Sequence, residues 1–139
     1  MTNPYQQSTA QITLYALGTT TLGGAGYGEG TYGYGAYGYG TGAGGGFITM
    51  GPQLARVWWL PEVIYCSTPS QSLSQFYLYR NGTAQANLIG WTLSGNGDQV
   101  PFIGGPLTSG EFLVGQWIGG DNGVQATMTI TGQQQVPGA

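Results

Sequence analysis

Histidine and lysine are absent from this chain of 139 residues, and its only charged side chains are two arginines and five acidic residues. Without histidine and lysine, the chain lacks the most common general base, the amine of Schiff-base enzymes and the usual phosphate-binding cation. A net charge of −3 argues against binding to nucleic-acid phosphates, which depends on clustered Lys and Arg. It argues equally against docking to an anionic membrane surface. We therefore expect neither nucleic acid nor a membrane as a partner.

Cysteine occurs once, as Cys66 in the run VIYCST. A single cysteine forms no disulfide within the chain and offers no cysteine cluster for a metal, so we expect a small core residue here. The N-terminal sequence MTNPYQQSTAQ has neither a basic region nor an apolar run, which predicts no signal peptide. No window approaches the apolar length of a membrane span. These features predict synthesis and folding in a cytoplasm.

Four carboxylates are the only candidates for catalysis in the part of the chain that looks globular. A flanking pair of Asp or Glu residues is what glycoside hydrolysis requires. Both aspartates, however, adjoin Asn-Gly turn sequences, where Asp commonly bonds the local backbone. The same turns offer oxygen atoms for Ca²⁺, but their spacing matches no calcium loop. We therefore expect no catalytic, cofactor-binding or metal-binding residue, and a glycosidase is the least favoured alternative. The four carboxylates are Glu62, Asp98, Glu111 and Asp121.

Residues 21–46, TLGGAGYGEGTYGYGAYGYGTGAGGG, are half glycine, and tyrosines carry nearly all of their side-chain mass. Such a segment cannot by itself bury enough apolar area to offset the entropy of ordering its backbone. Tyrosine offers a large contact area with few rotatable bonds, and glycine lets another backbone approach closely. We therefore predict an extended assembly arm that orders against neighbouring subunits. The tyrosines expected at this interface are Tyr27, Tyr32, Tyr34, Tyr37 and Tyr39.

The composition of this segment also fits three simpler interpretations. It is compatible with a flexible linker, with a low-complexity tract or with a solvent-exposed loop. The very low charge of the whole chain favours the assembly arm, because a surface so poor in charge keeps a free monomer soluble only weakly.

One short strand-like run precedes the Gly/Tyr segment, and from Phe47 onward the sequence has the pattern of short strands separated by turns. Turn signals such as Asn81-Gly82 recur every 8–12 residues, and no window has a helical period. This pattern predicts an all-β, antiparallel β-sandwich, with a jelly roll as the commonest two-sheet alternative to the immunoglobulin type. The strand-like runs are 11–17, 54–60, 62–68, 72–81, 84–95, 99–103, 111–120 and 124–132.

These runs divide the chain into three parts. We expect an extended N-terminal arm at 1–46, a sandwich domain at 47–132 and a polar C-terminal tail at 133–139. In the last run, Val124, Ala126, Met128 and Ile130 alternate with polar residues, which predicts one buried face and one polar face.

Trp58 and Trp59 are adjacent, so on a strand their side chains point to opposite faces. At least one of them is therefore exposed, at an interface or at a bulge. Exposed Trp and Tyr beside Asn and Gln on a small sandwich also suit stacking on sugar rings. A carbohydrate-binding module for attachment to host-surface glycans is thus the alternative to an assembly subunit.

The runs ARVWWLPEV and GEFLVGQWIGGDNGVQATMTITG resemble small virion structural proteins of tailed bacteriophages, particularly phages of actinobacteria. The Gly/Tyr-rich run is similar to runs in such proteins, and the resemblance covers roughly 54–132 plus that segment. It implies a β-sandwich displayed on the particle as a minor tail protein or a capsid decoration protein, and it carries over no functional residue.

Together these observations predict a non-enzymatic structural protein of a bacteriophage virion. Its partners would be other virion proteins and further copies of itself, with a trimer as one option because particles present small proteins at symmetric positions. Its location would be the virion, after synthesis in the host cytoplasm.

Overall fold

The computed structural model describes residues 9–22, 46–121 and 123–137, and these residues form an all-β fold, as the sequence predicts. One short 3₁₀ turn, Gln85–Asn87, interrupts the strands. The strands are β1 Thr9–Thr21, β2 Gly46–Met50, β3 Trp58–Ser67, β4 Ser74–Arg80, β5 Leu88–Trp91, β6 Asp98–Pro101, β7 Leu113–Gly119 and β8 Gln125–Pro137.

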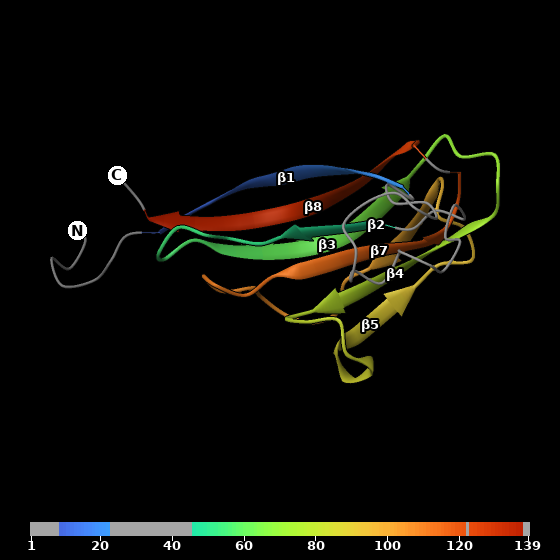
Figure 1. Ribbon diagram of the computed structural model, residues 1–139. Helices are drawn as coiled ribbons and strands as arrows, with labels where there is room; N and C mark the ends of the chain where they lie inside the picture. Colours follow the sequence, from blue (N-terminus) through green and yellow to red (C-terminus); the bar gives the residue numbers. More distant parts are fainter. Residues whose placement is uncertain (1–8, 23–45, 122, 138–139) are drawn as a thin grey trace, which may run out of the picture.

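The strands form two four-stranded sheets, and every pairing in them is antiparallel. The first sheet has the order β1-β8-β3-β6, and the second has the order β2-β7-β4-β5. Figure 1 shows the long strands β1 and β8 side by side above the second sheet. Strands far apart in the sequence are therefore neighbours in both sheets.

The core lies between the two sheets and takes side chains from both. Trp117 and Phe76 of the second sheet are fully buried, and their rings meet edge to face with centroids 4.8 Å apart. The indole N–H of Trp117 donates to the carbonyl of Gly95 at 2.9 Å, which satisfies its one polar atom. Each fully buried side chain of this size stabilises the fold by about 1.5–3 kcal/mol. Other buried members are Leu14, Leu22, Ile48, Ile64, Cys66, Leu78, Val100, Leu107, Leu113, Ala126, Met128 and Ile130.

Gly115 sets how closely the sheets approach at the centre of the core. A Cβ atom on Gly115 would lie 2.5 Å from the Met128 sulfur and 2.7 Å from the Phe76 ring. Met128 belongs to β8 in the opposite sheet, so only a residue without a side chain fits between the layers here.

β8 follows the alternation that its sequence predicts. Ala126, Met128 and Ile130 are fully buried, and the intervening threonines face outward. Pro101 lies on β6 at the edge of its sheet, where a residue without an N–H is tolerated. Gly90 lies close to Val100, because a Cβ atom on it would be 2.4 Å away from that side chain. Cys66 is confirmed as a core residue, with 1% of its surface exposed.

The structure divides the chain differently from the expected arm, sandwich and tail. Residues 9–21, placed in the arm at 1–46, form a full strand of the first sheet. Residues 133–137, placed in the tail at 133–139, are the end of β8, paired with residues 9–13. The strand predicted at 11–17 is confirmed as part of β1, whereas the polar residues 133–137 extend β8 and pair with residues 9–13. The Gly/Tyr part of the predicted arm, residues 23–45, lies outside the described residues.

Two strand predictions are also corrected. The runs 54–60 and 62–68 are one strand, β3, which continues through Pro61 with a register shift between Pro61 and Val63. The N–H of Trp59 points away from β8 to Leu107, so by the alternation of a strand the N–H that Pro61 lacks is not one of those that bond β8. The run 84–95 contributes only Leu88–Trp91, because the 3₁₀ turn follows Asn81-Gly82 in place of a tight hairpin.

Candidate functional site

The five tyrosines predicted at the assembly interface (Tyr27, Tyr32, Tyr34, Tyr37, Tyr39) lie outside the described residues. The two tryptophans are described, and they diverge as their adjacency predicts. Trp58 is 42% exposed, whereas Trp59 is partly buried and packs against the core. Trp59 is also bonded through its backbone to Leu107, with N···O distances of 2.9 and 2.8 Å. Of these two tryptophans, Trp58 is therefore the one available for contacts at the surface.

Trp58 belongs to the outer face of the first sheet, which we call the Thr/Gln face. Its centre is a row of outward residues on β8, flanked by outward residues of β1 and β3 at the same level of the ladder. The row on β8 is Gln125, Thr127, Thr129, Thr131, Gln133 and Gln135. The flanking residues are Gln11, Thr13, Tyr15, Leu17, Thr19 and Thr21 on β1, and Trp58, Leu60, Val63, Tyr65 and Ser67 on β3.

Exposed aromatic rings stand on both sides of this row. Tyr15 is 67% exposed and lies level with Thr131, and Tyr65 is 42% exposed and lies level with Thr129. Two inter-strand steps and one two-residue step separate the tyrosines, which places their Cα atoms about 12 Å apart. The register brings them together, and the sequence alone gave no sign of it because Tyr15 and Tyr65 are fifty residues apart in the chain.

None of these positions on the Thr/Gln face is charged, and the one charged residue of β3 is Glu62, exposed at the bulge between Pro61 and Val63. Its hydroxyl and amide groups both donate and accept hydrogen bonds, and its rings offer apolar area. The arrangement suits a neutral partner, either another protein surface or an uncharged sugar chain.

A second apolar area lies where β5 approaches β6, at the other edge of both sheets. Ile89 and Trp91 are 43% and 54% exposed, and Ile103 beyond β6 is 91% exposed. With Pro101 and Leu88 they line an open groove of about 430 Å³. This area is also uncharged, so the exposed surface offers aliphatic and aromatic contact on two sides of the molecule.

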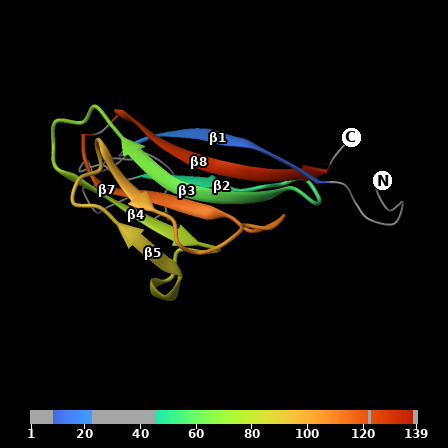
Figure 2. The same cartoon turned by 180° about the vertical axis from the view of Figure 1, so that it is seen from behind.

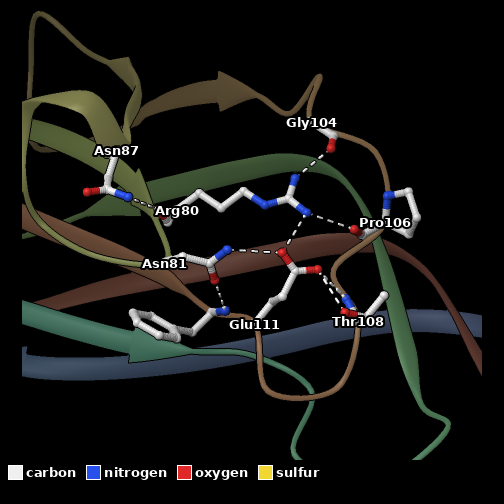
Figure 3. A network of polar contacts seen from close by, with 8 residues as sticks. Arg80, Asn81, Asn87, Gly104, Pro106, Thr108 and Glu111 are labelled. Atoms are coloured by element: carbon white, nitrogen blue, oxygen red, sulfur yellow. Dashed lines mark hydrogen bonds and ion pairs between the residues drawn. The ribbon is translucent and has the colours of Figure 1, made fainter.

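The main polar cluster joins the end of β4 to the loop before β7 (Figure 3). Both oxygens of Glu111 are occupied. Oε2 accepts from Arg80 and Asn81 at 3.0 Å, and Oε1 accepts from the backbone and hydroxyl of Thr108 at 2.9 Å. These hydrogen bonds, led by that of the Thr108 backbone, lower the pKa of Glu111 from 4.5 to about 2. Arg80 also donates to the carbonyls of Gly104 and Pro106.

Asp121 has a similar structural role at the opposite end of the strands. Its carboxylate accepts from the backbone of Gln71 at 2.8 Å and from the hydroxyl of Ser72. The Ser72 hydrogen bond is the main cause that lowers the pKa of Asp121. Of the four carboxylates considered for catalysis, Glu111 and Asp121 thus tie loops together.

The described residues contain no group of three His, Cys, Asp or Glu side chains placed to hold a metal ion. Over the same residues, no helix is long and apolar enough to cross a bilayer.

Compared with models of protein families, with curated proteins and with solved structures, the chain matches none.

Proposed function

We propose that this protein is a non-enzymatic structural component of a bacteriophage virion, either a minor tail protein or a capsid decoration protein. It would assemble through its Gly/Tyr segment and through the surfaces of its two sheets. The observation that carries the proposal is the amount of apolar side chain left uncovered on a nearly uncharged surface. Large uncovered apolar areas mark interaction sites. The most exposed apolar residues are Leu73 at 96%, Ile103 at 91%, Leu93 at 79% and Leu54 at 72%.

We further propose that the fold is a jelly roll, a double-sheet architecture used by viral capsid proteins and by lectins. In a jelly roll the chain behaves as one long hairpin rolled into two sheets, so the first strand pairs with the eighth and the second with the seventh. The strand orders contain the nested pairs β1–β8, β2–β7, β3–β6 and β4–β5. This nesting supports a jelly roll over an immunoglobulin-type sandwich.

The proposed mechanism needs binding and no chemical step. The core fixes two rigid sheets, and loop carboxylates such as Glu111 hold the connections between strands. Burial of exposed apolar area against neighbours would contribute about 25 cal/mol per Å², which has to exceed the entropy lost when an arm becomes ordered. The resemblance to small phage virion proteins agrees with this mechanism.

The test removes the Gly/Tyr segment and leaves the sheets intact. Leu22 is fully buried, and Gly46 packs beside Thr20 and Thr21 at the end of β1. A short Gly/Ser linker can therefore replace residues 23–45. We expect phage carrying this gene to lose the protein from purified particles, while the purified variant keeps the thermal midpoint of the full chain.

A second variant tests whether the aromatic rings are responsible. It keeps the length of the segment and changes only its tyrosines to serine, at Tyr27, Tyr32, Tyr34, Tyr37 and Tyr39. If the aromatic rings make the contacts, this variant also fails to join particles. Unchanged incorporation of the linker variant would contradict an assembly role for the segment. Neighbouring genes separate the two locations, since capsid genes favour decoration of the head and baseplate or fibre genes favour the tail.

A carbohydrate-binding module for host-surface glycans is the second candidate. It is favoured by the uncharged Thr/Gln face with Tyr65 and Trp58 exposed beside hydroxyl and amide groups. Neutral oligosaccharides from the host cell wall would then quench the fluorescence of Trp58. Trp58→Ala and Tyr65→Ala would each weaken binding by at least about tenfold, whereas Trp91→Ala, an exposed residue on β5, would not. Fluorescence that no such oligosaccharide changes would remove this candidate.

A further inference from the structure

β1 is a long strand at the edge of the first sheet. It spans 13 residues, and within the described part of the chain its only strand partner is β8. Figure 2 shows it along the outer margin of the molecule, beside β8. Gln11, Thr13, Tyr15, Leu17 and Thr19 are all exposed. An edge strand of this kind presents a row of backbone donors and acceptors to any other extended chain.

The ladder shows which backbone groups of β1 point to the free edge. The N–H of Leu22, just beyond the strand, donates to the carbonyl of Val124 at 2.7 Å, so even-numbered residues point toward β8. Because backbone direction alternates along a strand, odd-numbered residues from 9 to 21 point away from it. One of these odd carbonyls, that of Thr13, accepts a long hydrogen bond of 3.4 Å from the Gln134 side chain. Tyr15 is the central residue of this odd-numbered row.

The other three edge strands carry features that discourage pairing. β6 has four residues, which include Asp98 and Pro101. β5 has four residues and an irregular register with β4, and β2 has only five. Short length, charge, proline and bulges are the usual protections of a sheet edge. β1 has none of them, since it contains no charged residue and no proline.

We propose that β1 pairs with β1 of a second copy, antiparallel, about a two-fold axis at Tyr15. This arrangement joins the two first sheets into one continuous eight-stranded sheet. It deepens the proposed assembly role by naming a partner, and its biological use rests on that role. A two-fold contact is closed, so β1 alone predicts a dimer, in contrast to the trimer considered from the sequence.

The sequence of β1 is self-complementary in this register. Centring on Tyr15 pairs all 13 residues, and each residue faces the one equally far from Tyr15 on the second copy. On the inner face, Ile12 lies opposite Gly18 and Leu14 lies opposite Ala16, so a large side chain always faces a small one. Ile12 is 46% exposed in the single chain, and the pairing would cover it. With no charges in the strand, no like charges meet across the axis.

The experiment uses the full chain. In the proposed dimer, Tyr15 of one chain lies opposite Tyr15 of the second chain, so one substitution changes both sides of the contact. Sedimentation of the wild-type protein should show a dimer. Tyr15→Lys and Tyr15→Glu should each raise the dimer dissociation constant by at least about tenfold, because like charges then meet across the axis. An equimolar mixture of the two variants should form a heterodimer again. Tyr65→Lys, on the same face but away from the edge, should leave the dimer unchanged.

A wild-type chain that stays monomeric at all concentrations would overturn the proposal, and so would a dimer that neither charge at position 15 weakens. Amide hydrogen exchange on the wild-type chain gives a second test that needs no variant. The odd-numbered amides of β1 should become protected as concentration rises. Protection that is already complete in a monomer would mean that another part of the same chain covers this edge. Because these measurements need no particle, failure of the dimer leaves the virion role to its own test.

Discussion

Nη2 of Arg80 lies 3.0 Å from Oε2 of Glu111, and this ion pair connects the end of β4 to the loop that leads into β7. Both side chains are only partly exposed, at 21% and 27%. The guanidinium carbon of Arg80 also lies 5.8 Å from the centre of the Phe102 ring, which adds a cation–π contact. Asn81 has a positive φ of 61° and binds both Glu111 and Phe112, so the turn after β4 depends on the same cluster.

The lowered pKa of Glu111 predicts a loss of stability in acid. A carboxylate with a depressed pKa in the folded state stabilises the fold above its unfolded pKa, and this contribution is lost as the pH falls. For Glu111 the loss spans the range from 4.5 down to about 2. Because the group is partly exposed, solvent screening limits the contribution to about 1 kcal/mol. Urea unfolding of the wild-type chain from pH 7 down to about pH 2 measures it.

Glu111→Gln should unfold more easily than the wild type at pH 7 and should lose less stability on acidification. The reason is that glutamine is neutral and has one acceptor oxygen, so it cannot accept from Arg80 and Asn81 and also from Thr108 as the two carboxylate oxygens do. Glu62→Gln is the matched control, since Glu62 is exposed and makes no side-chain hydrogen bond within the described residues. Equal pH dependence in wild type and Glu111→Gln would show that the carboxylate contributes nothing to acid sensitivity.

The thiol of Cys66 should be unreactive toward disulfide reagents in the folded protein. Its thiol is buried, and desolvation by this burial raises the pKa of Cys66. Its sulfur lies 3.4 Å from the carbonyl of Asp98, to which the thiol donates. Since a thiolate is the reactive form, a disulfide reagent should label Cys66 at least about a thousandfold more slowly than a free thiol.

The control for this labelling is Ser67→Cys in a chain that also carries Cys66→Ala. Ser67 is the next residue on β3 and is exposed, so its replacement should react at once. Fast labelling of native Cys66 would mean that β6 or the segment after β5 opens readily, because the sulfur contacts Asp98 on β6 and Thr92 and Ser94 after β5.

Trp117 contributes both buried apolar surface and a hydrogen bond to the core. Trp117→Phe keeps the edge-to-face contact with Phe76 but removes the donor to the Gly95 carbonyl. Because a buried carbonyl loses its partner and the larger ring leaves space, the free energy of unfolding should fall by about 2–3 kcal/mol. Denaturant unfolding with an unchanged m-value measures it, and a cost below about 0.5 kcal/mol would contradict the burial of this bond.

Local periodicity was enough to predict the all-β class and several strands. The alternation in β8 predicts Ala126, Met128 and Ile130 as buried, and the structure confirms it. These predictions succeeded because side-chain alternation depends only on neighbouring residues in the same strand.

Pairing between distant strands could not be predicted in this way. Residues 133–137 pair with residues 9–13, which lie more than one hundred positions away. Taken alone, QQQVP is polar and resembles a solvated tail, because nothing in the local sequence indicates its partner strand. The meeting of Tyr15 and Tyr65 across β8 follows from the same register. The predicted division into two strands at Pro61 is wrong for another reason, because β3 continues past this proline through a bulge.

Gly115 offers the most direct test of how the two sheets pack. Gly115→Ala would place a methyl group 2.5 Å from the Met128 sulfur and 2.7 Å from Phe76, closer than real atoms come. Both neighbours are fully buried, so the layers have to separate or the ring has to move. We expect the free energy of unfolding to fall by about 2–3 kcal/mol. Gly46→Ala on the short edge strand β2 is the control, because its new methyl would meet nothing nearer than 3.0 Å, and its cost should stay below about 1 kcal/mol. Equal costs for the two variants would mean that the sheets do not meet at Gly115 as described.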